Sequence, residues 1–385
     1  MWLILIAYSF HFTRHGIIFP FMPLLATRLG AGATTIGFIV GAFSLVAVFL
    51  SIPLGGLVDR FGVKRLLLFG VLCNIVNALI LLQTDTVAGL VTAQLIGGIA
   101  FLLHVVASQA YISRLPDAHR RETGFGWLSI GASAGQSVGP ILGGLLVDYF
   151  DYQSAFWVVL VLSSAGLILV GLKKTRESNP TQISYSPIQD ARQAGSLLWD
   201  PKVLMILIFT FAIVFAANLR ASFLPVLLRA EGLTELTVGV LIAIFSVTST
   251  TIRLVFGRLM DTFSRTHILV SAMLAIMLAV GLIPSTASTT GFAILIAIFG
   301  LGFGLTQPMS MVMMADLTDP NHSGLSMGLR LTVIMVAGLL SPVCLGFIVE
   351  TIGLAPAFYT AAMVVALAGV RMFILRPDLI PDRRL

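Results

Sequence analysis

Charged residues are scarce in this sequence. Only 10% of its 385 residues are Asp, Glu, Lys or Arg, whereas 57% are apolar, and the mean hydropathy is +1.00. A soluble domain of this length carries roughly a quarter charged residues, so water cannot be the solvent for most of this surface. The composition therefore excludes an ordinary soluble protein and predicts an integral protein of the lipid bilayer.

Cysteine is also rare, and Cys73 and Cys344 both lie inside apolar runs. Isolated cysteines of this kind are typical of small buried side chains, so we expect no disulfide, no metal site and no cofactor. The net charge of +6 would suggest a nucleic-acid partner in a soluble protein. In a membrane protein the positive-inside bias accounts for it, and we expect no nucleic-acid partner.

Long apolar runs fill the chain. A bilayer core of about 30 Å takes about 20 apolar residues per helix, and this rule divides the sequence into twelve expected spans. They lie near residues 2–28, 34–58, 65–83, 87–113, 123–147, 152–173, 203–229, 235–259, 266–285, 289–316, 322–350 and 353–375. The predicted fold class is therefore an all-α polytopic membrane protein. The first run lacks the basic leader and cleavage site of a signal peptide, so we interpret it as the first span.

Lys and Arg are distributed unevenly over the loops. The even-numbered loops and the tail carry Arg60, Lys64, Arg65, Arg114, Arg120, Arg121, Arg258, Arg265, Arg376, Arg383 and Arg384. The odd-numbered loops hold little beyond Arg28 and Arg229. Because Lys and Arg accumulate on the cytoplasmic side, we expect both termini in the cytoplasm. The expected membrane is the inner membrane of a bacterial or archaeal cell.

The two halves of the chain repeat at a constant offset of 202 residues. The identical pairs are Pro23 and Pro225, Thr35 and Thr237, Gly37 and Gly239, Gly55 and Gly257, Asp59 and Asp261, Phe61 and Phe263, Gly98 and Gly300, Asp117 and Asp319, Gly126 and Gly328, Pro140 and Pro342, and Gly144 and Gly346. The repeat predicts two equivalent six-helix halves in parallel orientation, an arrangement used by transporters that rock about a midplane site.

One long polar stretch, rich in Ser, Pro and Gln, separates these halves. The expected domains are an N-terminal six-helix bundle at residues 1–173, a cytoplasmic linker at 174–202 and a C-terminal six-helix bundle at 203–385. Residues 188–199 are compatible with a plain tether or with a short amphipathic helix on the inner membrane surface.

The loop after the second span reads Gly55-Gly-Leu-Val-Asp59-Arg60-Phe-Gly62-Val-Lys64-Arg65, with a degenerate copy from Gly257 to Arg265. It resembles the signature loop of the major facilitator superfamily, which implies two pseudo-symmetric six-helix bundles and a cytoplasmic gating latch. An acid at a helix end can pair with loop arginines and face a neighbouring helix N-terminus.

The expected latch residues are Gly55, Asp59, Arg60, Gly62, Lys64, Arg65, Asp261 and Arg265. We expect Asp59 near the start of the eleventh span and Asp261 near the start of the fifth. A solvated turn with ordinary topogenic charge is the alternative.

The fifth span carries Gly126, Gly135, Gly139, Pro140, Gly143 and Gly144. This spacing resembles the antiporter motif of the drug:proton branches of the superfamily, which implies an exporter. Glycines at four-residue spacing leave a flat groove for a neighbouring helix, and Pro140 bends the helix. Generic small-residue packing is the alternative interpretation. The resemblance covers the whole chain and leaves the subfamily open.

One position departs from the drug:proton pattern, which has an arginine where this chain has Gln94, four residues before Gly98. In addition, all 17 acidic residues fall in loops or near the ends of the expected spans. If a proton is the coupling ion, it would have to use a histidine, an acid near a helix end or the substrate itself.

Two arginines, Arg14 and Arg220, lie well inside expected spans, and His11 and His15 flank the first. An ionisable residue at this depth is costly and usually faces a cavity. By the repeat offset, Arg220 corresponds to position 18, one helical turn from Arg14. One arginine on each of these two helices resembles the organophosphate:phosphate antiporter branch. We therefore expect an anionic group to bind between Arg14 and Arg220. Pairing of Arg14 with a carbonyl, or snorkelling, is the alternative.

Further candidates for the cavity are His104 and Asn218. A packing histidine and an amide that bridges helices are equally simple interpretations, and Asn74, Asn77, Gln136 and Gln307 allow the same two. Arg253 and Arg330 lie near cytoplasmic helix ends and fit the latch better than the cavity.

The function predicted is that of a monomeric secondary transporter, most simply an exporter of an anionic or amphipathic organic solute. General multidrug efflux by proton antiport and an organic-anion uptake or exchange permease are the alternatives. A membrane enzyme would need a nucleophile, metal cluster or carboxylate pair within the spans, and the sequence offers none. A lipid scramblase-like protein and a sensor that has lost transport are further rivals.

Overall fold

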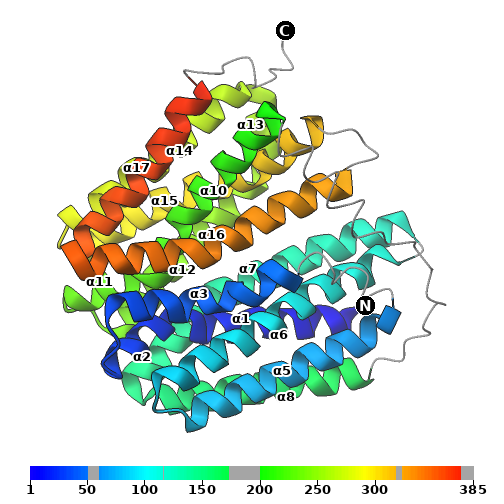
Figure 1. The fold of residues 1–385 in the computed structure, drawn as a ribbon. Coiled ribbons are helices and arrows are strands. Elements are labelled where there is room, and N and C mark those ends of the chain that lie inside the picture. Colours follow the sequence, from blue (N-terminus) through cyan, green and yellow to red (C-terminus); the bar gives the residue numbers. More distant parts are fainter. Residues whose placement is uncertain (51–59, 116, 173–199, 318–322, 374–385) are drawn as a thin grey trace. The chain divides into compact units, whose positions relative to one another are not determined.

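The computed structural model describes residues 1–50, 60–115, 117–172, 200–317 and 323–373, and all regular structure in these ranges is helical (Figure 1). The helices are α1 (Trp2–Ile18), η1 (Phe19–Phe21), α2 (Met22–Arg28), α3 (Ala33–Leu50), α5 (Val63–Gln83), α6 (Val87–Ser113), α7 (Ala118–Tyr149), α8 (Tyr152–Leu172), α10 (Pro201–Ser222), α11 (Leu224–Ala230), α12 (Glu235–Leu254), α13 (Phe256–Thr262), α14 (Arg265–Leu282), η2 (Ile283–Ser285), α15 (Thr289–Leu317), α16 (Ser323–Ile352) and α17 (Leu354–Phe373).

Eleven helices of the described chain are long and apolar enough to cross a membrane. The first expected span is not among them, because the helix predicted over residues 2–28 is interrupted. Its α1 part has 17 residues and is followed by η1 and α2. Pro20 and Pro23 lie at this break, and proline has no backbone N–H for the helical ladder. With α1 and α2 counted as one broken span, the described ranges are consistent with the twelve predicted spans, and the fold class is that of an all-α polytopic membrane protein.

The seventh expected span breaks in the same way. Helix α10 ends at Ser222 and α11 begins at Leu224, next to Pro225, the repeat counterpart of Pro23. The turns that follow α2 and α11 contain Gly30 and Gly232, with φ of 77° and 80°. Both values lie in the left-handed region that glycine adopts without strain. The repeat in the sequence is thus a repeat of local structure as well.

The eighth expected span, 235–259, also differs from the prediction, because it divides into α12 and α13 at Val255. Three other helices keep a proline in their interior, namely Pro140 in α7, Pro308 in α15 and Pro342 in α16. Neighbouring helices in a bundle can compensate the hydrogen bond that an internal proline loses. A proline within an apolar run therefore does not by itself fix where a helix ends.

The chain forms two compact units. The first contains Met1–Tyr185 and Leu228–Ala243, and the second contains Ser186–Leu227 and Ile244–Leu385. In the first unit α1 packs against α7 and α8, and in the second α10 packs against α16 and α17. The predicted linker falls almost entirely on residues 173–199, outside the described ranges, so the predicted domain boundaries stay predictions.

Large apolar side chains remain exposed on both units. Phe49 is 71% exposed and Leu254 is 80% exposed. Lipid offers such side chains the environment that water denies them, so this surface is the one that faces the bilayer. The interior of the first unit includes a cluster built on Tyr8, Phe12 and Leu128. This cluster anchors α1, the helix that carries the candidate site.

Candidate functional site

Arg14 lies inside the first unit with only 4% of its surface exposed. Its guanidinium donates hydrogen bonds to Oδ1 of Asn74 and to Oδ1 of Asn77, the latter at 2.6 Å. Both asparagines lie on α5, three residues apart, so one face of that helix holds both. No carboxylate among the described residues pairs with Arg14, and its Nε has no hydrogen-bond partner there. A full positive charge is therefore buried against neutral amides alone.

The two asparagines continue this network in different directions. Nδ2 of Asn77 donates to the carbonyl oxygen of Ala93 on α6 at 2.6 Å. Nδ2 of Asn74 lies 3.1 Å from Nδ1 of His11, one turn before Arg14 on α1. Of the two interpretations open from the sequence, the bridging of helices is confirmed for both asparagines. They bridge by way of a buried charge.

His11 and His104 form a stacked pair on α1 and α6. Their ring centroids are 4.4 Å apart and their planes differ by 5°. They are 2% and 1% exposed. Nε2 of His11 and both ring nitrogens of His104 have no hydrogen bond of normal geometry in the described part of the chain. His104 is thus a buried stacking partner of His11.

His15 lies among three phenylalanine rings, which we call the aromatic cluster: Phe19, Phe43 and Phe101. Its ring centroid is 4.6 Å from that of Phe19 and 5.1 Å from each of the other two. All four residues are partly exposed. The cluster follows Arg14 directly along α1, so a polar site and an apolar aromatic site adjoin each other.

Arg220, on α10 of the second unit, has a different environment. Its guanidinium carbon lies 4.3 Å from the ring centroid of Phe245, a cation–π contact. Its Nε has no hydrogen-bond partner within the described ranges. Nearby Asn218 donates to the carbonyl oxygen of Val214 on its own helix at 2.9 Å. The structure therefore places Arg220 on an aromatic face and engages Asn218 with the backbone.

The two units match in the packing around these arginines. Phe43 and Phe101 have ring centroids 5.4 Å apart, and their counterparts at the offset of 202, Phe245 and Phe303, are also 5.4 Å apart. A Cβ atom on Gly98 would overlap the carbonyl oxygen of Phe43. On Gly300 it would come within 2.7 Å of the carbonyl oxygen of Phe245. Glycine is thus required at both positions for the same backbone approach.

The predicted latch residues are described in part. Gly55 and Asp59 lie outside the described residues. Gly62 has φ 81° and precedes α5, where Nζ of Lys64 donates to the carbonyl oxygen of Gly171 at 3.1 Å. In the second unit Arg265 forms an ion pair with Asp316 at 2.6 Å. Arg60 precedes Gly62, Arg65 lies in the first turn of α5 and Asp261 lies in the last turn of α13. The latch stays a prediction.

Arg330, expected to belong to the latch, donates hydrogen bonds to α15 within the second unit. Its Nε donates to Oγ of Ser310 at 2.9 Å, and its NH2 group donates to Oε1 of Gln307 at 2.9 Å. These bonds make Gln307 a bridge between helices, one of the two roles considered for it.

The glycines of the fifth span make close helix contacts within the first unit. Built Cβ atoms on Gly135, Gly139 and Gly143 would each come within 2.6 Å of the backbone of α1. The opposite flank of α7 faces α12, where the carbonyl oxygen of Pro140 lies against Gly239 and the Cα of Gly144 lies nearby. Gly126 has open space around it. The motif is therefore a packing surface for two helices over most of its length.

One charged cluster, formed by Glu235, Arg28 and Arg229, could not be predicted from the sequence. Glu235, the first residue of α12, is 5% exposed and accepts a hydrogen bond from Arg28 at 2.8 Å. Arg229 lies 3.4 Å away on its other side. The guanidinium of Arg28 also stacks over the ring of Tyr152 at 4.6 Å. Glu235 follows Arg229 closely in the sequence but lies 207 residues from Arg28, so the convergence of the three residues depends on tertiary structure.

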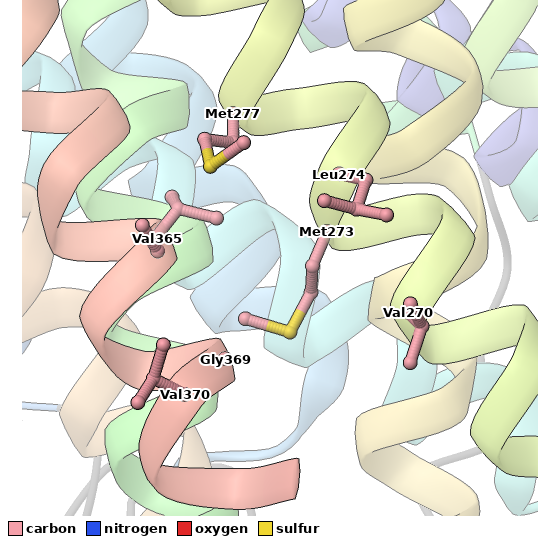
Figure 2. Close-up of a pocket in the computed structure, with 8 residues that line it drawn as sticks. Val270, Met273, Leu274, Met277, Val365, Gly369 and Val370 are labelled. Atoms are coloured by element: carbon pink, nitrogen blue, oxygen red, sulfur yellow. The ribbon is translucent and has the colours of Figure 1, made fainter. Parts of the chain in front are cut away.

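The second unit has a groove of about 270 Å³ between α14 and α17. Figure 2 shows Met273 and Met277 on α14 and Val365 on α17 around it. All of its lining residues are apolar or glycine. Such a groove suits hydrocarbon and offers nothing that could recognise a polar group, so it is not the candidate site.

The family model of the Major Facilitator Superfamily matches residues 4–234 and, again, residues 207–384. An uncharacterized MFS-type transporter of Methanocaldococcus jannaschii is 24% identical over 373 residues, which cover 92% of each chain. Multidrug resistance protein 1 of Bacillus subtilis is 22% identical, over 91% of this chain and 90% of that protein. Among solved structures, a mutant of the nucleoside transporter NupG aligns over 99% of both chains with a TM-score of 0.81 and 14% identity, a likeness of fold.

Proposed function

Because the chain belongs to the Major Facilitator Superfamily, we propose that it is a secondary transporter that exports an amphipathic organic solute bearing an anionic group. A solute of this kind combines a negative charge with an apolar body. Arg14 on α1 would bind the negative charge, and the aromatic cluster would bind the apolar body. The anionic group defines the class of solute that we propose.

The single observation that carries the proposal is the environment of Arg14. Two amide oxygens hold a buried guanidinium that no carboxylate neutralises within the described residues. A buried charge without a counter-ion costs several kcal/mol. A carboxylate, sulfonate or phosphate of the solute would supply the missing charge through short, charge-assisted hydrogen bonds. Binding of a cation beside this guanidinium is opposed by the same charge.

The aromatic cluster supports the amphipathic part of the proposal. Phe19, Phe43 and Phe101 are partly exposed and surround His15, immediately beyond Arg14 on the same helix. Aromatic faces of this kind bind apolar and aromatic groups. A solute whose anionic head is held by Arg14 would place its apolar body here.

Arg220 is the second residue that we propose for anion binding during the transport cycle. Its contact with Phe245 leaves the guanidinium without a counter-ion in the described chain. His11, His15, His104 and Asn218 complete the set of residues proposed for the cavity. Among these, Asn218 contributes only after it releases the backbone of Val214.

Export is proposed on two grounds. The glycine motif of the fifth span has the spacing of the antiporter branches, and a relative that matches nearly the whole chain is named a multidrug resistance protein. General multidrug efflux is the second candidate function, favoured by the same relative. The charge of Arg14 favours an anionic solute over the lipophilic cations that such a pump would also carry.

The proposed location is the inner membrane of a bacterial or archaeal cell, with both termini in the cytoplasm. This orientation is supported by the Lys and Arg residues of the even-numbered loops. With it, the exported solute is loaded from the side on which Arg60, Lys64 and Arg65 lie.

A matched pair of probes tests the proposal. The purified protein is reconstituted in liposomes, and counterflow of labelled naphthalene sulfonate is compared with that of naphthyl trimethylammonium, which has the same ring and the opposite charge. We expect transport of the sulfonate and little of the cation. Transport of the cation without the sulfonate would replace the proposal by cationic drug efflux.

A further inference from the structure

The hydrogen bonds around Arg14 have a fixed order of donors and acceptors, on which the proposed function does not depend. Arginine has only donors, so the Asn74 atom that faces Arg14 must be Oδ1. The amide nitrogen of Asn74 then faces Nδ1 of His11 at 3.1 Å and must donate to it. Nδ1 of His11 is therefore an acceptor, and the ring is neutral with its proton on Nε2.

This arrangement excludes a proton from Nδ1 of His11 as long as Arg14 holds Asn74. A protonated imidazole has donors on both nitrogens, and its Nδ1–H would point at the N–H of the Asn74 amide. The positive charge of Arg14 also repels a second positive charge on the neighbouring His11 ring. Both effects end if an anionic group binds the guanidinium in place of Asn74. The anion neutralises the charge of Arg14, and Oδ1 of Asn74 is then free to turn towards His11.

We propose that His11, in its stack with His104, is the proton site of this transporter, and that it accepts a proton only when an anionic group is bound at Arg14. The inference rests on the proposed function for the identity of the anion. The proton adds to Nδ1 of His11, the amide of Asn74 rotates, and its Oδ1 accepts the new N–H bond. A monoanion and one proton together leave the charge of the site at its starting value.

The other groups around His11 are consistent with a single proton. His104 on α6 and Arg14 and His15 on α1 are the ionisable groups that act on it, and Tyr8 stacks on His104 with centroids 6.1 Å apart. Helix α5 contributes amides. Helix α8 has no charged residue within Tyr152–Leu172, and α7 carries its charges near its two ends. His104 is a positioning residue, since its parallel ring fixes the plane of His11 and a second charge at 4.4 Å would be repelled.

The coupling between anion binding and proton binding determines the direction in which the proton moves relative to the solute. Because the anion and the proton favour each other's binding, they cross the membrane together. In a drug:proton antiporter the two ligands exclude each other instead. Export by this protein would then run down the gradient of the solute and carry a proton outwards, in keeping with Gln94 in place of the antiporter arginine.

The first test needs no solute. Asn74→Asp keeps the shape of the side chain and places a carboxylate against both Arg14 and His11. Histidine-selective isotope labelling and NMR of the full chain in nanodiscs report the charge of each ring. Free histidine titrates near pH ~6.5. We expect His11 to stay neutral at pH 6 in the wild type and to be largely imidazolium at that pH in Asn74→Asp.

The matched control is Asn218→Asp, the same substitution in the second unit, where the side chain bonds its own backbone. It should leave the signal of His11 unchanged. Arg14→Gln provides a second route if Asn74→Asp does not fold, because it removes the charge and releases Asn74. It should also raise the imidazolium fraction of His11 at pH 6 above that of the wild type. An imidazolium at His11 in the wild type, or a neutral ring at pH 6 in both Arg14→Gln and Asn74→Asp, would overturn the proposal.

A second measurement separates this inference from the proposed function. Liposomes with an enclosed pH dye are supplied with an inward gradient of naphthalene sulfonate. We expect the sulfonate to carry protons inwards in the wild type. In His11→Phe, which preserves an aromatic ring against His104, we expect the number of protons carried per sulfonate to fall, whatever the rate of sulfonate entry. Sulfonate entry with no proton movement in the wild type refutes the proton site and leaves the proposed function standing. Absence of sulfonate transport refutes the proposed function, while the NMR result still decides whether Arg14 controls the proton.

Discussion

A Cβ atom on Gly139 of α7 would lie 2.7 Å from the Cα atom of Gly16 on α1. The two backbones are therefore in direct contact, and neither side has a flexible side chain that could move aside. This contact sets the position of α1, and with it the position of Arg14. The glycines of the fifth span therefore hold α1, and with it Arg14, in position against α7.

Gly139→Ala should lower the stability of the protein by about 1–3 kcal/mol, the usual cost of overpacking a tight interface. Gly126→Ala is the matched control, since Gly126 belongs to the same motif and has open space around it. There the better helix propensity of alanine should leave the stability unchanged or raise it by up to about 1 kcal/mol. Thermal unfolding in detergent measures both, and equal melting temperatures would contradict the packing role.

Glu235→Gln should destabilise the start of α12. The variant leaves Arg28 and Arg229 without their shared carboxylate. Because these arginines are 53% and 39% exposed, the loss should be about 1 kcal/mol rather than the cost of a fully buried pair. Glu231→Gln, an exposed acid in the preceding turn, is the control. Unfolding of the two variants at the same temperature would show that the cluster contributes nothing.

Asp59→Asn should slow transport sharply and change solute affinity by no more than a few-fold. Asp59 belongs to the predicted latch, which acts on the switch between states rather than on the binding site. Asp85→Asn, in the turn between α5 and α6, is the comparison and should transport normally. Rates from counterflow and affinities from equilibrium binding separate the two effects, and a normal rate for Asp59→Asn would rule out the latch.

Phe43→Ala and Phe101→Ala should each weaken binding of naphthalene sulfonate by about tenfold, equivalent to the 1.4 kcal/mol scale of an aromatic contact. Phe69→Ala removes the same ring from α5, where Phe69 is 55% exposed on the outer surface, and should bind normally. Equilibrium binding is the measurement. If all three variants bind alike, the apolar body of the solute lies elsewhere.

The fold could be predicted from the sequence to a large extent, for physical reasons. Apolar runs as long as a bilayer is thick have few alternatives to spanning it, and the offset of 202 residues appears in the structure as paired breaks, turns and aromatic contacts. The breaks themselves were missed. Pro20 and Pro23 end a helix, whereas Pro140 and Pro342 do not, and the difference depends on neighbouring helices.

The candidate site was predictable only where a residue is exceptional. Arg14 is conspicuous in an apolar run, but its partners Asn74 and Asn77 were two of several spanning amides, and nothing in sequence spacing joins α1 to α5. The aromatic cluster gave no signal, because the chain has 26 phenylalanines. His104 could be identified in the sequence as a histidine within an expected span. Its stacking on His11 depends on the packing of α6 against α1 and could not be predicted.

The central claim, that an anionic group is recognised by Arg14 and Arg220, is tested most directly by replacing Arg14 and Arg220 singly with Gln and measuring flux and binding of naphthalene sulfonate. The account predicts that each variant loses at least about tenfold in sulfonate transport, since each lost charge-assisted pair is worth roughly 1.5–3 kcal/mol. Undiminished transport by both variants, or tight binding of a dication by the unmutated protein, would contradict it.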